Sequence, residues 1–445
     1  MFSSIILAAG KSKRMKSKKP KVFHKIGGAP LLWYPINLLK NLKCKDINIV
    51  INKEMKDVEN FVKNEFDGIN IFFQNNQLGT ANAVKSVKKS SIITNFQERT
   101  LILYGDVPLL KRETIENFIK IKDPSIKIKL LAFRKNDPKN YGRLIIDEKK
   151  NLIKVVEEID ATSDEKKIGL CNSGILYADT KILFELLDQI KNKNMAGEFY
   201  LTDIIEIAYF KNIKTTFQEC NENETMGINT RKDLAFVEEI FQNDKRSYFL
   251  DNGVTLKDPK SVYFSYDTQI GVDSVIQQNV IIGENVIIKD NCNILPFSHL
   301  EGCTIESNTS VGPFARLRPN TLIEKNCKIG NFVEVKEALL KEGTKVNHLS
   351  YIGDAKIEEN VNIGAGTIFC NFDGNKKNKT FIGKNSFIGS NSSLVAPVNV
   401  GKNVVIGSGS VITNNIPSES LSLSRVDQKN IPKSGQKILN RKKLK

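Results

Sequence analysis

The stretch that decides the fold is residues 382–412, which read IGKNSF IGSNSS LVAPVN VGKNVV IGSGSV I. An aliphatic residue returns at every sixth position here, and the same period runs from Ile270 to Ile294 and from Ile305 to Val335. A period of six is typical of a parallel β-helix, in which one aliphatic residue per hexad points inward. We expect the glycine that often follows this residue, as at Gly383, to let the chain turn a corner.

Two segments, residues 337–345 and 370–379, interrupt the six-residue period. An interruption of a solenoid predicts a loop, and loops on a rigid scaffold often carry function. Harmless insertions are the alternative, and the residues beside the interruptions decide between the two.

The first half of the chain has a different pattern, in which short apolar runs alternate with amphipathic stretches. Residues 3–8, 48–51, 69–73 and 100–104 predict strands, and residues 81–89 predict a helix. This alternation favours a parallel α/β sheet, whose ligands bind at the carboxyl ends of the strands.

Residues 229–250 predict one long helix between the two halves. Thr230 is the expected N-cap, Asp233 stands three residues later, and Gly253 follows the end. We therefore divide the chain into an α/β domain (1–228), a linker helix (229–250), a β-helix domain (251–425) and a tail (426–445).

Composition excludes several classes of function. Three histidines and seven scattered cysteines without a C-x-x-C pair argue against a zinc site or a disulfide framework. No apolar run approaches the roughly 20 residues of a membrane span, and we expect a cytoplasmic protein. The net charge of +16 indicates a lysine-rich surface rather than nucleic-acid binding, because no nucleic-acid motif accompanies it. The tail after Arg425 is the most basic segment.

Phosphate chemistry is indicated near the N-terminus. The loop LAAGKSKRM (7–15) follows a strand, and its backbone N–H groups together with Arg14 can bind phosphates. Lys21 adds a second cation, and Asp106 ends a strand, where a carboxylate can bind Mg²⁺. Each feature alone is equally consistent with an ordinary turn.

A second set of charged residues lies in the β-helix. Arg318 and Lys336 are 18 residues apart, which is three hexads, so stacked coils place them side by side where they can bind a phosphate. His348 lies at the end of the first interruption, and a neutral imidazole can remove a proton from an amine near neutral pH.

The motifs together resemble a known family. They are LAAGxxxRM (7–15), Pro20-Lys21, QLGT (77–80), YGDVP (104–108), YGR (141–143), NSG (172–174), GIN (227–229), GPFARLRP (312–319), NHLSY (347–351) and CNFDG (370–374). The chain is similar, from about Ser3 to about Arg425, to the bacterial bifunctional N-acetylglucosamine-1-phosphate uridyltransferase / glucosamine-1-phosphate acetyltransferase family. The resemblance implies an α/β Rossmann-like nucleotidyltransferase domain followed by a left-handed parallel β-helix, with UDP-N-acetylglucosamine as the product.

For the first domain, the resemblance implies UTP and Mg²⁺ as ligands. Arg14 and Lys21 would stabilise the phosphates during catalysis, and Asp106 and Asn229 would hold the metal. The implied nucleotide and sugar contacts are Leu7, Ala8, Ala9, Gly10, Lys21, Gln74, Gly79, Thr80, Tyr104, Gly105, Asp106, Gly142, Glu157, Asn172 and Asn229. The family usually has Gly-Thr where this chain has Ser12-Lys13.

For the second domain, the resemblance implies acetyl-CoA and glucosamine 1-phosphate as substrates and a homotrimer with sites between subunits. His348 would be the general base, assisted by Glu334. The sugar phosphate would contact Arg318, Lys336, Tyr351 and Asn362, and acetyl-CoA would contact Ala365, Asn371, Phe372, Ser390, Ser408 and Arg425. The family usually has tyrosine where this chain has Phe372, and alanine where it has Ser408. The basic tail would lie near the CoA phosphates bound by a neighbouring subunit.

Two other functions remain open from the sequence. One is a nucleotidyltransferase with a single activity, in which the β-helix only assembles subunits; the intact set around His348 argues against it. The other is a regulatory subunit without catalysis, which would not need Arg14, Lys21 and Asp106 together with His348.

Overall fold

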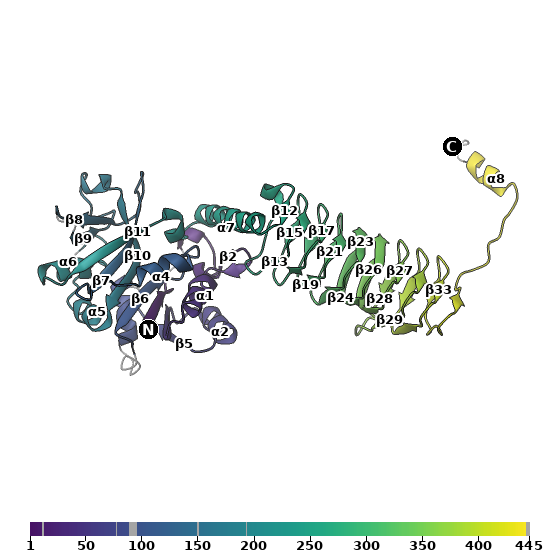
Figure 1. Cartoon of the computed structure of the whole chain (residues 1–445), viewed down its shortest axis with the longest axis horizontal. Coiled ribbons are helices and arrows are strands. Elements are labelled where there is room, and N and C mark those ends of the chain that lie inside the picture. Colours follow the sequence, from purple (N-terminus) through teal and green to yellow (C-terminus); the bar gives the residue numbers. More distant parts are fainter. Residues whose placement is uncertain (11–12, 77, 89–95, 149–150, 193, 442–445) are drawn as a thin grey trace. The chain divides into compact units, whose positions relative to one another are not determined.

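A computed structural model describes residues 1–10, 13–76, 78–88, 96–148, 151–192 and 194–441 of the 445-residue chain (Figure 1). The chain forms two compact units, residues 1–242 and 243–445, which divide within helix α7 (Arg231–Asp251). The functional limits at residues 228, 250 and 425 stay a prediction.

A mixed sheet forms the centre of the first unit, with the strand order β11-β7-β10-β6-β1-β4-β5. The predicted strands are present as β1 (Ser3–Leu7), β4 (Asp46–Ile51), β5 (Ile69–Phe73) and β6 (Arg99–Tyr104), and these four are parallel. The predicted strands therefore form a parallel sheet as expected, but the full sheet is mixed, because β10 (Leu170–Asp179) runs antiparallel to β6 and to β7 (Ile128–Arg134). Apolar runs do not specify strand direction, which depends on the distant partner that a strand finds.

The sheet brings distant segments of the sequence together at one edge. β1 pairs with β6 in the register Leu7↔Tyr104, so the loops that follow these two strands leave the sheet side by side. Helix α3 (Thr80–Lys88) buries Ala81, Val84 and Val87 in the same core as Ile5 and Ile102. The remaining elements are η1 (Lys13–Met15), η2 (Lys21–Phe23), β2 (Lys25–Ile26), β3 (Ala29–Pro30), α1 (Trp33–Asn41), α2 (Lys56–Glu65), α4 (Arg112–Phe118), β8 (Arg143–Ile146), β9 (Leu152–Val156), η4 (Glu165–Lys167), α5 (Thr180–Leu187), α6 (Asp203–Phe210), β11 (Thr215–Cys220) and η5 (Glu222–Thr225).

Helix α7 begins with the capping arrangement that its sequence predicts. The Thr230 hydroxyl accepts a hydrogen bond from the Asp233 amide at 3.1 Å, and the Asp233 carboxylate accepts from the Asn229 and Thr230 amides at 2.9 and 2.8 Å. These bonds satisfy N–H groups that the first turn of a helix leaves without partners. They also fix Asn229 at a helix start.

The second unit is a parallel β-helix, as the six-residue period predicts. Its short strands, from β12 (Thr255–Leu256) to β35 (Leu421–Ser422), stack coil upon coil, and every pairing between named strands in this unit is parallel (Figure 1). The inward aliphatic residues form one continuous core, in which Ile276, Val311 and Ile388 are fully buried. Because one coil covers the next, the stack buries apolar side chains that a single coil would expose.

The glycines of the hexads have a different role from the one expected. The left-handed corner conformation belongs mostly to asparagines, with φ of 58° at Asn279, 58° at Asn285 and 56° at Asn291. A Cβ added at Gly330 would lie 1.7 Å from the carbonyl oxygen of Asn347 in the next coil. Glycine is therefore required where adjacent coils approach closely. Asparagine occupies the corners because its short polar side chain lets the backbone adopt the left-handed conformation at little cost.

The two interruptions differ from each other. At 337–345 the expected loop was wrong: strand β24 (Glu334–Leu340) continues through a corner at Glu337, and the coil is only 17 residues long, with Val335 beside Ile352. At 370–379 the chain does form a loop, since Ala355 faces Thr380, 25 residues later. Only the second interruption adds chain outside the coil.

The seven cysteines are all free thiols. Among the described residues, no helix combines the length and apolarity that crossing a membrane requires. The last described helix, α8 (Ser434–Arg441), lies in the basic tail.

Candidate active sites

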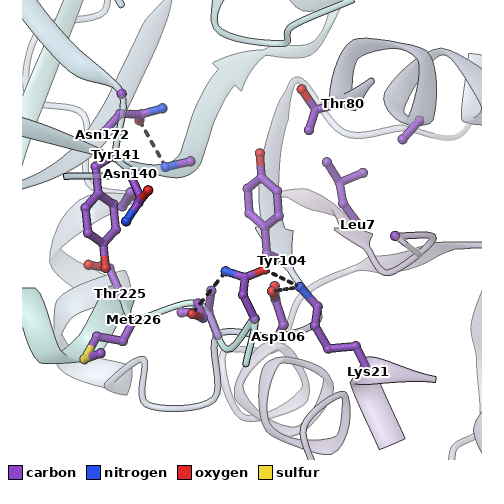
Figure 2. A pocket seen from close by; sticks show the side chains of 18 of the residues that line it. Leu7, Lys21, Thr80, Tyr104, Asp106, Asn140, Tyr141, Asn172, Thr225 and Met226 are labelled. Atoms are coloured by element: carbon purple, nitrogen blue, oxygen red, sulfur yellow. Dashed lines mark hydrogen bonds and ion pairs between the residues drawn. The ribbon is translucent and has the colours of Figure 1, made fainter. Parts of the chain in front are cut away.

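A cavity of about 830 Å³ opens in the first unit at the carboxyl ends of β1 and β6 (Figure 2). Fourteen of the fifteen predicted nucleotide and sugar contacts line it, together with Arg14. Gly105 is the exception: its amide bonds the Leu7 carbonyl at 3.0 Å, and an added Cβ would meet Ala8 at 3.1 Å. It therefore supports the floor of the cavity. Ser12 and Gln77, which belong to the predicted motifs, lie outside the described residues.

Four polar side chains are joined on one wall of this cavity. The ammonium of Lys21 pairs with the carboxylate of Asp106 (Figure 2). It also donates to Oδ1 of Asn229 at 3.1 Å, and Nη2 of Arg14 donates to the same Oδ1 at 2.9 Å. Asp106 is 9 % exposed. The two predicted metal ligands therefore face one cation, and their carboxylate and amide oxygens suit Mg²⁺.

The wall predicted to hold the sugar contains a partly buried carboxyl group. Glu157 follows β9, and burial raises its pKa, partly offset by a hydrogen bond of 3.3 Å from the Thr202 hydroxyl. A Cβ at Gly142 would lie 3.2 Å from Oε2 of Glu157, so glycine there leaves this carboxyl accessible. Asn172 is 8 % exposed, and its Oδ1 accepts from the Gly174 amide at 3.0 Å.

Tyr104 stands between these two walls (Figure 2). Burial raises the pKa of its phenol, and the charges of Glu157 and Asp106 raise it further. The hydroxyl therefore stays protonated and can donate a hydrogen bond at any physiological pH.

Several residues that line the cavity were not predicted. They are Val22, Ala83, Val107, Lys139, Asn140, Tyr141, Ser173, Gly174, Glu198, Tyr200, Thr202, Thr225, Met226, Gly227, Thr230 and Asp233. Tyr141, Ser173 and Gly227 belong to predicted motifs, which could have indicated them. No pattern in the sequence distinguishes Tyr200 or Met226, which the fold places there.

In the second unit, the predicted sugar-phosphate residues lie on successive coils. Nη1 of Arg318 donates to Oε1 of Glu334 at 2.8 Å, and Glu334 is paired in register with Tyr351. The charge of Arg318 contributes to lowering the pKa of Lys336, as their spacing predicts. Asn362 stands on β27 (Asn362–Ile363), beside Lys345 on the preceding coil.

His348 is exposed at the end of β25 (Lys345–His348). Its Nδ1 lies 2.6 Å from Oδ1 of Asn331, and its carbonyl accepts from the Gly366 amide at 3.3 Å. Glu334 pairs with Arg318 instead, so its predicted assistance to the imidazole stays a prediction. Asn331, which the sequence did not single out, is the residue that orients His348 here.

Lys377 was also missed. It lies in the loop at 370–379, and its ammonium is the largest influence that lowers the pKa of Lys336, ahead of burial. The two lysines therefore lie close together, and the charge of Asp354 acts on both of them. The long coil that carries Lys377 is the feature that could have indicated it.

The predicted acetyl-CoA residues follow one another toward the C-terminus. Asn371 donates to Oδ2 of Asp354 at 2.5 Å and to the Tyr351 hydroxyl at 3.3 Å, and Phe372 beside it is 60 % exposed. The Ala365 carbonyl accepts from the Asn391 amide at 2.7 Å, next to Ser390. The Gly409 amide bonds the Ser390 carbonyl at 2.8 Å, and Nη1 of Arg425 bonds the Ser408 carbonyl at 2.9 Å.

Comparison with known proteins gives one consistent result. The family model described as MobA-like NTP transferase domain matches residues 4–139, and the model described as bacterial transferase hexapeptide (six repeats) matches residues 302–337 and 379–414. The chain is 42% identical over 446 residues to the bifunctional protein GlmU of Zymomonas mobilis, covering 100% of this chain and 99% of that relative. It is 43% identical over 439 residues to the bifunctional protein GlmU of Jannaschia sp., covering 99% and 96%. On this identity over the full length, the chain belongs to the family of bifunctional GlmU proteins.

Proposed function

We propose that each of the two units of this chain catalyses one of the two steps in the synthesis of UDP-N-acetylglucosamine. The second unit transfers the acetyl group of acetyl-CoA to glucosamine 1-phosphate. The first unit then joins the product to UTP. The observation that supports this division best is that the two predicted residue sets gather separately, one around the cavity and one on the coils near His348.

In the first unit, a phosphate oxygen of N-acetylglucosamine 1-phosphate attacks the α-phosphorus of UTP, and pyrophosphate leaves. Such a reaction needs positioning and neutralisation of charge more than covalent help. Arg14 and Lys21 supply positive charge at one wall, and Glu157 and Asn172 hold the sugar at the other. Asp106 and Asn229 would hold Mg²⁺, which neutralises phosphate charge when bound.

In the second unit, the imidazole of His348 accepts a proton from the amine of the sugar. The amine nitrogen bonds to the acetyl carbonyl carbon, and the thiolate of CoA leaves and takes up a proton. Arg318, Lys336 and Lys377 bind the phosphate of the sugar, because these three cations converge on one region. The backbone near Ala365, one coil from His348, supports the developing oxyanion.

A homotrimer is part of this proposal. Phe297, Phe314 and Phe332 stack at successive corners with ring centroids 4.9 and 5.1 Å apart, and Leu349 follows on the next coil. Each of the four side chains is about half exposed. Phe332 and Leu349 of this apolar column directly follow Asn331 and His348 in the sequence. A second copy of the chain packed on the column would therefore lie beside the acetyl-transfer site and complete it. The substrates UTP and acetyl-CoA favour a cytoplasmic location.

Two assays on the full chain test the proposal. Pyrophosphate release from UTP with N-acetylglucosamine 1-phosphate reports the first reaction, and CoA thiol release with glucosamine 1-phosphate reports the second. We expect Asp106→Asn to lower only the first rate, about 100-fold, since it removes the charged ligand proposed for Mg²⁺. Absence of either release from the folded wild-type protein would contradict the proposal for that unit.

A further inference from the structure

The cation between the two predicted metal ligands is Lys21. Its ammonium contacts the Asp106 carboxylate (Figure 2) and Oδ1 of Asn229, the same oxygens that the proposed function assigns to Mg²⁺. The Asn229 oxygen also accepts from Arg14 at 2.9 Å. Without nucleotide, both oxygens therefore already have cationic partners.

The backbone of Lys21 is fixed, but its side chain can move. Short helix η2 (Lys21–Phe23) is held by the bonds Phe23 N–Pro20 O at 3.0 Å and His24 N–Lys21 O at 3.1 Å, and Val22 is 4 % exposed. The lysine side chain is 18 % exposed and faces the cavity. A flexible four-carbon stem on such an anchor lets the ammonium exchange one anionic partner for another.

We propose that Lys21 acts as a resident counter-cation, which keeps free divalent metal out of the nucleotide-free site. Two cations cannot share the Asp106 and Asn229 oxygens without strong repulsion. The triphosphate offers Lys21 a more highly charged partner, so its arrival releases both oxygens to the metal that it brings. Metal therefore enters with the nucleotide and not before it. This inference rests on the proposed assignment of Asp106 and Asn229 as metal ligands.

Binding of Mn²⁺, a paramagnetic substitute for Mg²⁺, tests the inference without measuring activity. The amount of free Mn²⁺ is followed by electron paramagnetic resonance for the wild type, Lys21→Met and Lys139→Met. Lys139 also lines the cavity, but its ammonium pairs with Asp137 at 3.2 Å, so it is a matched control. Circular dichroism checks that each variant is folded.

Without nucleotide, we expect Lys21→Met to bind Mn²⁺ at least about tenfold more tightly than the wild type, and Lys139→Met to match the wild type. With a non-hydrolysable UTP analogue, the advantage of Lys21→Met should disappear, because the wild-type lysine has then moved to the phosphates. Equal or weaker Mn²⁺ binding by Lys21→Met without nucleotide would overturn the inference.

A further variant distinguishes an error in the role of Lys21 from an error in the proposed metal ligands. Asp106→Asn should weaken the binding of Mn²⁺ by the complex of protein and UTP analogue, measured as the excess over Mn²⁺ bound by the analogue alone. If it does, but Lys21→Met shows no gain without nucleotide, only the role of Lys21 is wrong. If Mn²⁺ binding with the analogue does not depend on Asp106, the metal assignment in the proposed function fails, and the inference fails with it.

Discussion

The two sites of this chain are built in opposite ways. In the first unit, loops from distant parts of the sequence enclose a cavity, in which Asp106 is buried and already paired with Lys21. In the second unit, residues on adjacent coils form a ladder on the outside of a solenoid, and His348 and Lys377 are exposed. A mixed sheet can close a pocket within one chain, whereas a ladder leaves its functional groups open to a substrate or a neighbouring subunit.

The largest expected effect separates the two sites by their chemistry. His348→Ala should lower the rate of acetyl transfer by about 10²–10⁴-fold, because general-base catalysis is lost. The rate of uridylyl transfer should stay within about twofold, since the first site contains none of the groups affected. Both rates are measured on the same preparation, with CoA thiol and pyrophosphate as readouts.

His299→Ala is the matched control, because His299 is also an exposed histidine of the β-helix, at the start of β18 (His299–Leu300). It should retain acetyl transfer. A loss of uridylyl transfer in His348→Ala would show that the two sites are not separable in this way.

The second prediction concerns stability. Gly330→Ala should destabilise the β-helix by about 3 kcal/mol, because its Cβ would overlap the carbonyl of Asn347 and force two coils apart. We expect loss of acetyl transfer at a temperature where uridylyl transfer persists. Thermal unfolding followed by circular dichroism measures the change. Gly435→Ala, where no atom lies within 4 Å of the added Cβ, should leave this transition unchanged.

The third prediction concerns substrate binding by the open site. Lys377→Ala should raise the KM for glucosamine 1-phosphate about tenfold, since one charge-assisted contact to a phosphate is lost. The kcat of acetyl transfer should change much less. Lys376→Ala removes an exposed charge from the adjacent position and serves as the control. An unchanged KM for Lys377→Ala would exclude the lysine from the phosphate site.

In the second unit, the sequence predicted the β-helix correctly but not the course of both interruptions. In the first unit, its motifs predicted the residues of the site better than its apolar pattern predicted the strand directions. A local period of six specifies the β-helix, since each coil packs only on its neighbours. The direction of β10 and the positions of Tyr200 and Met226 depend on long-range pairing, which no local pattern records. Asn331 and Lys377 were missed for a related reason: their importance lies in residues on other coils, His348 for Asn331 and Lys336 for Lys377.

The smallest expected effect tests whether enclosing a site has an energetic cost. Asp203 begins helix α6, and burial, followed by the charges of Glu206, Glu157 and Asp160, raises its pKa to about 6. Its ordinary value is 3.8, so the folded protein binds this proton more tightly than the unfolded chain does. The free energy of unfolding therefore falls as the pH rises from about 4 to about 6, where the carboxyl group must ionise inside the fold.

Asp203→Asn removes this cost, and we expect it to stabilise the first unit by about 1 kcal/mol near neutral pH, after allowance for partial solvent screening. The gain should shrink as the pH falls toward 4, because the wild-type carboxyl group is then protonated in both states. Urea unfolding at several pH values measures it. Asp164→Asn, whose side chain is 92 % exposed, should show no comparable pH-dependent gain. If the two variants change the free energy of unfolding equally at each pH, an ionised carboxyl group costs no more beside the cavity than on the surface. The two sites would then differ in shape but not in this energetic cost.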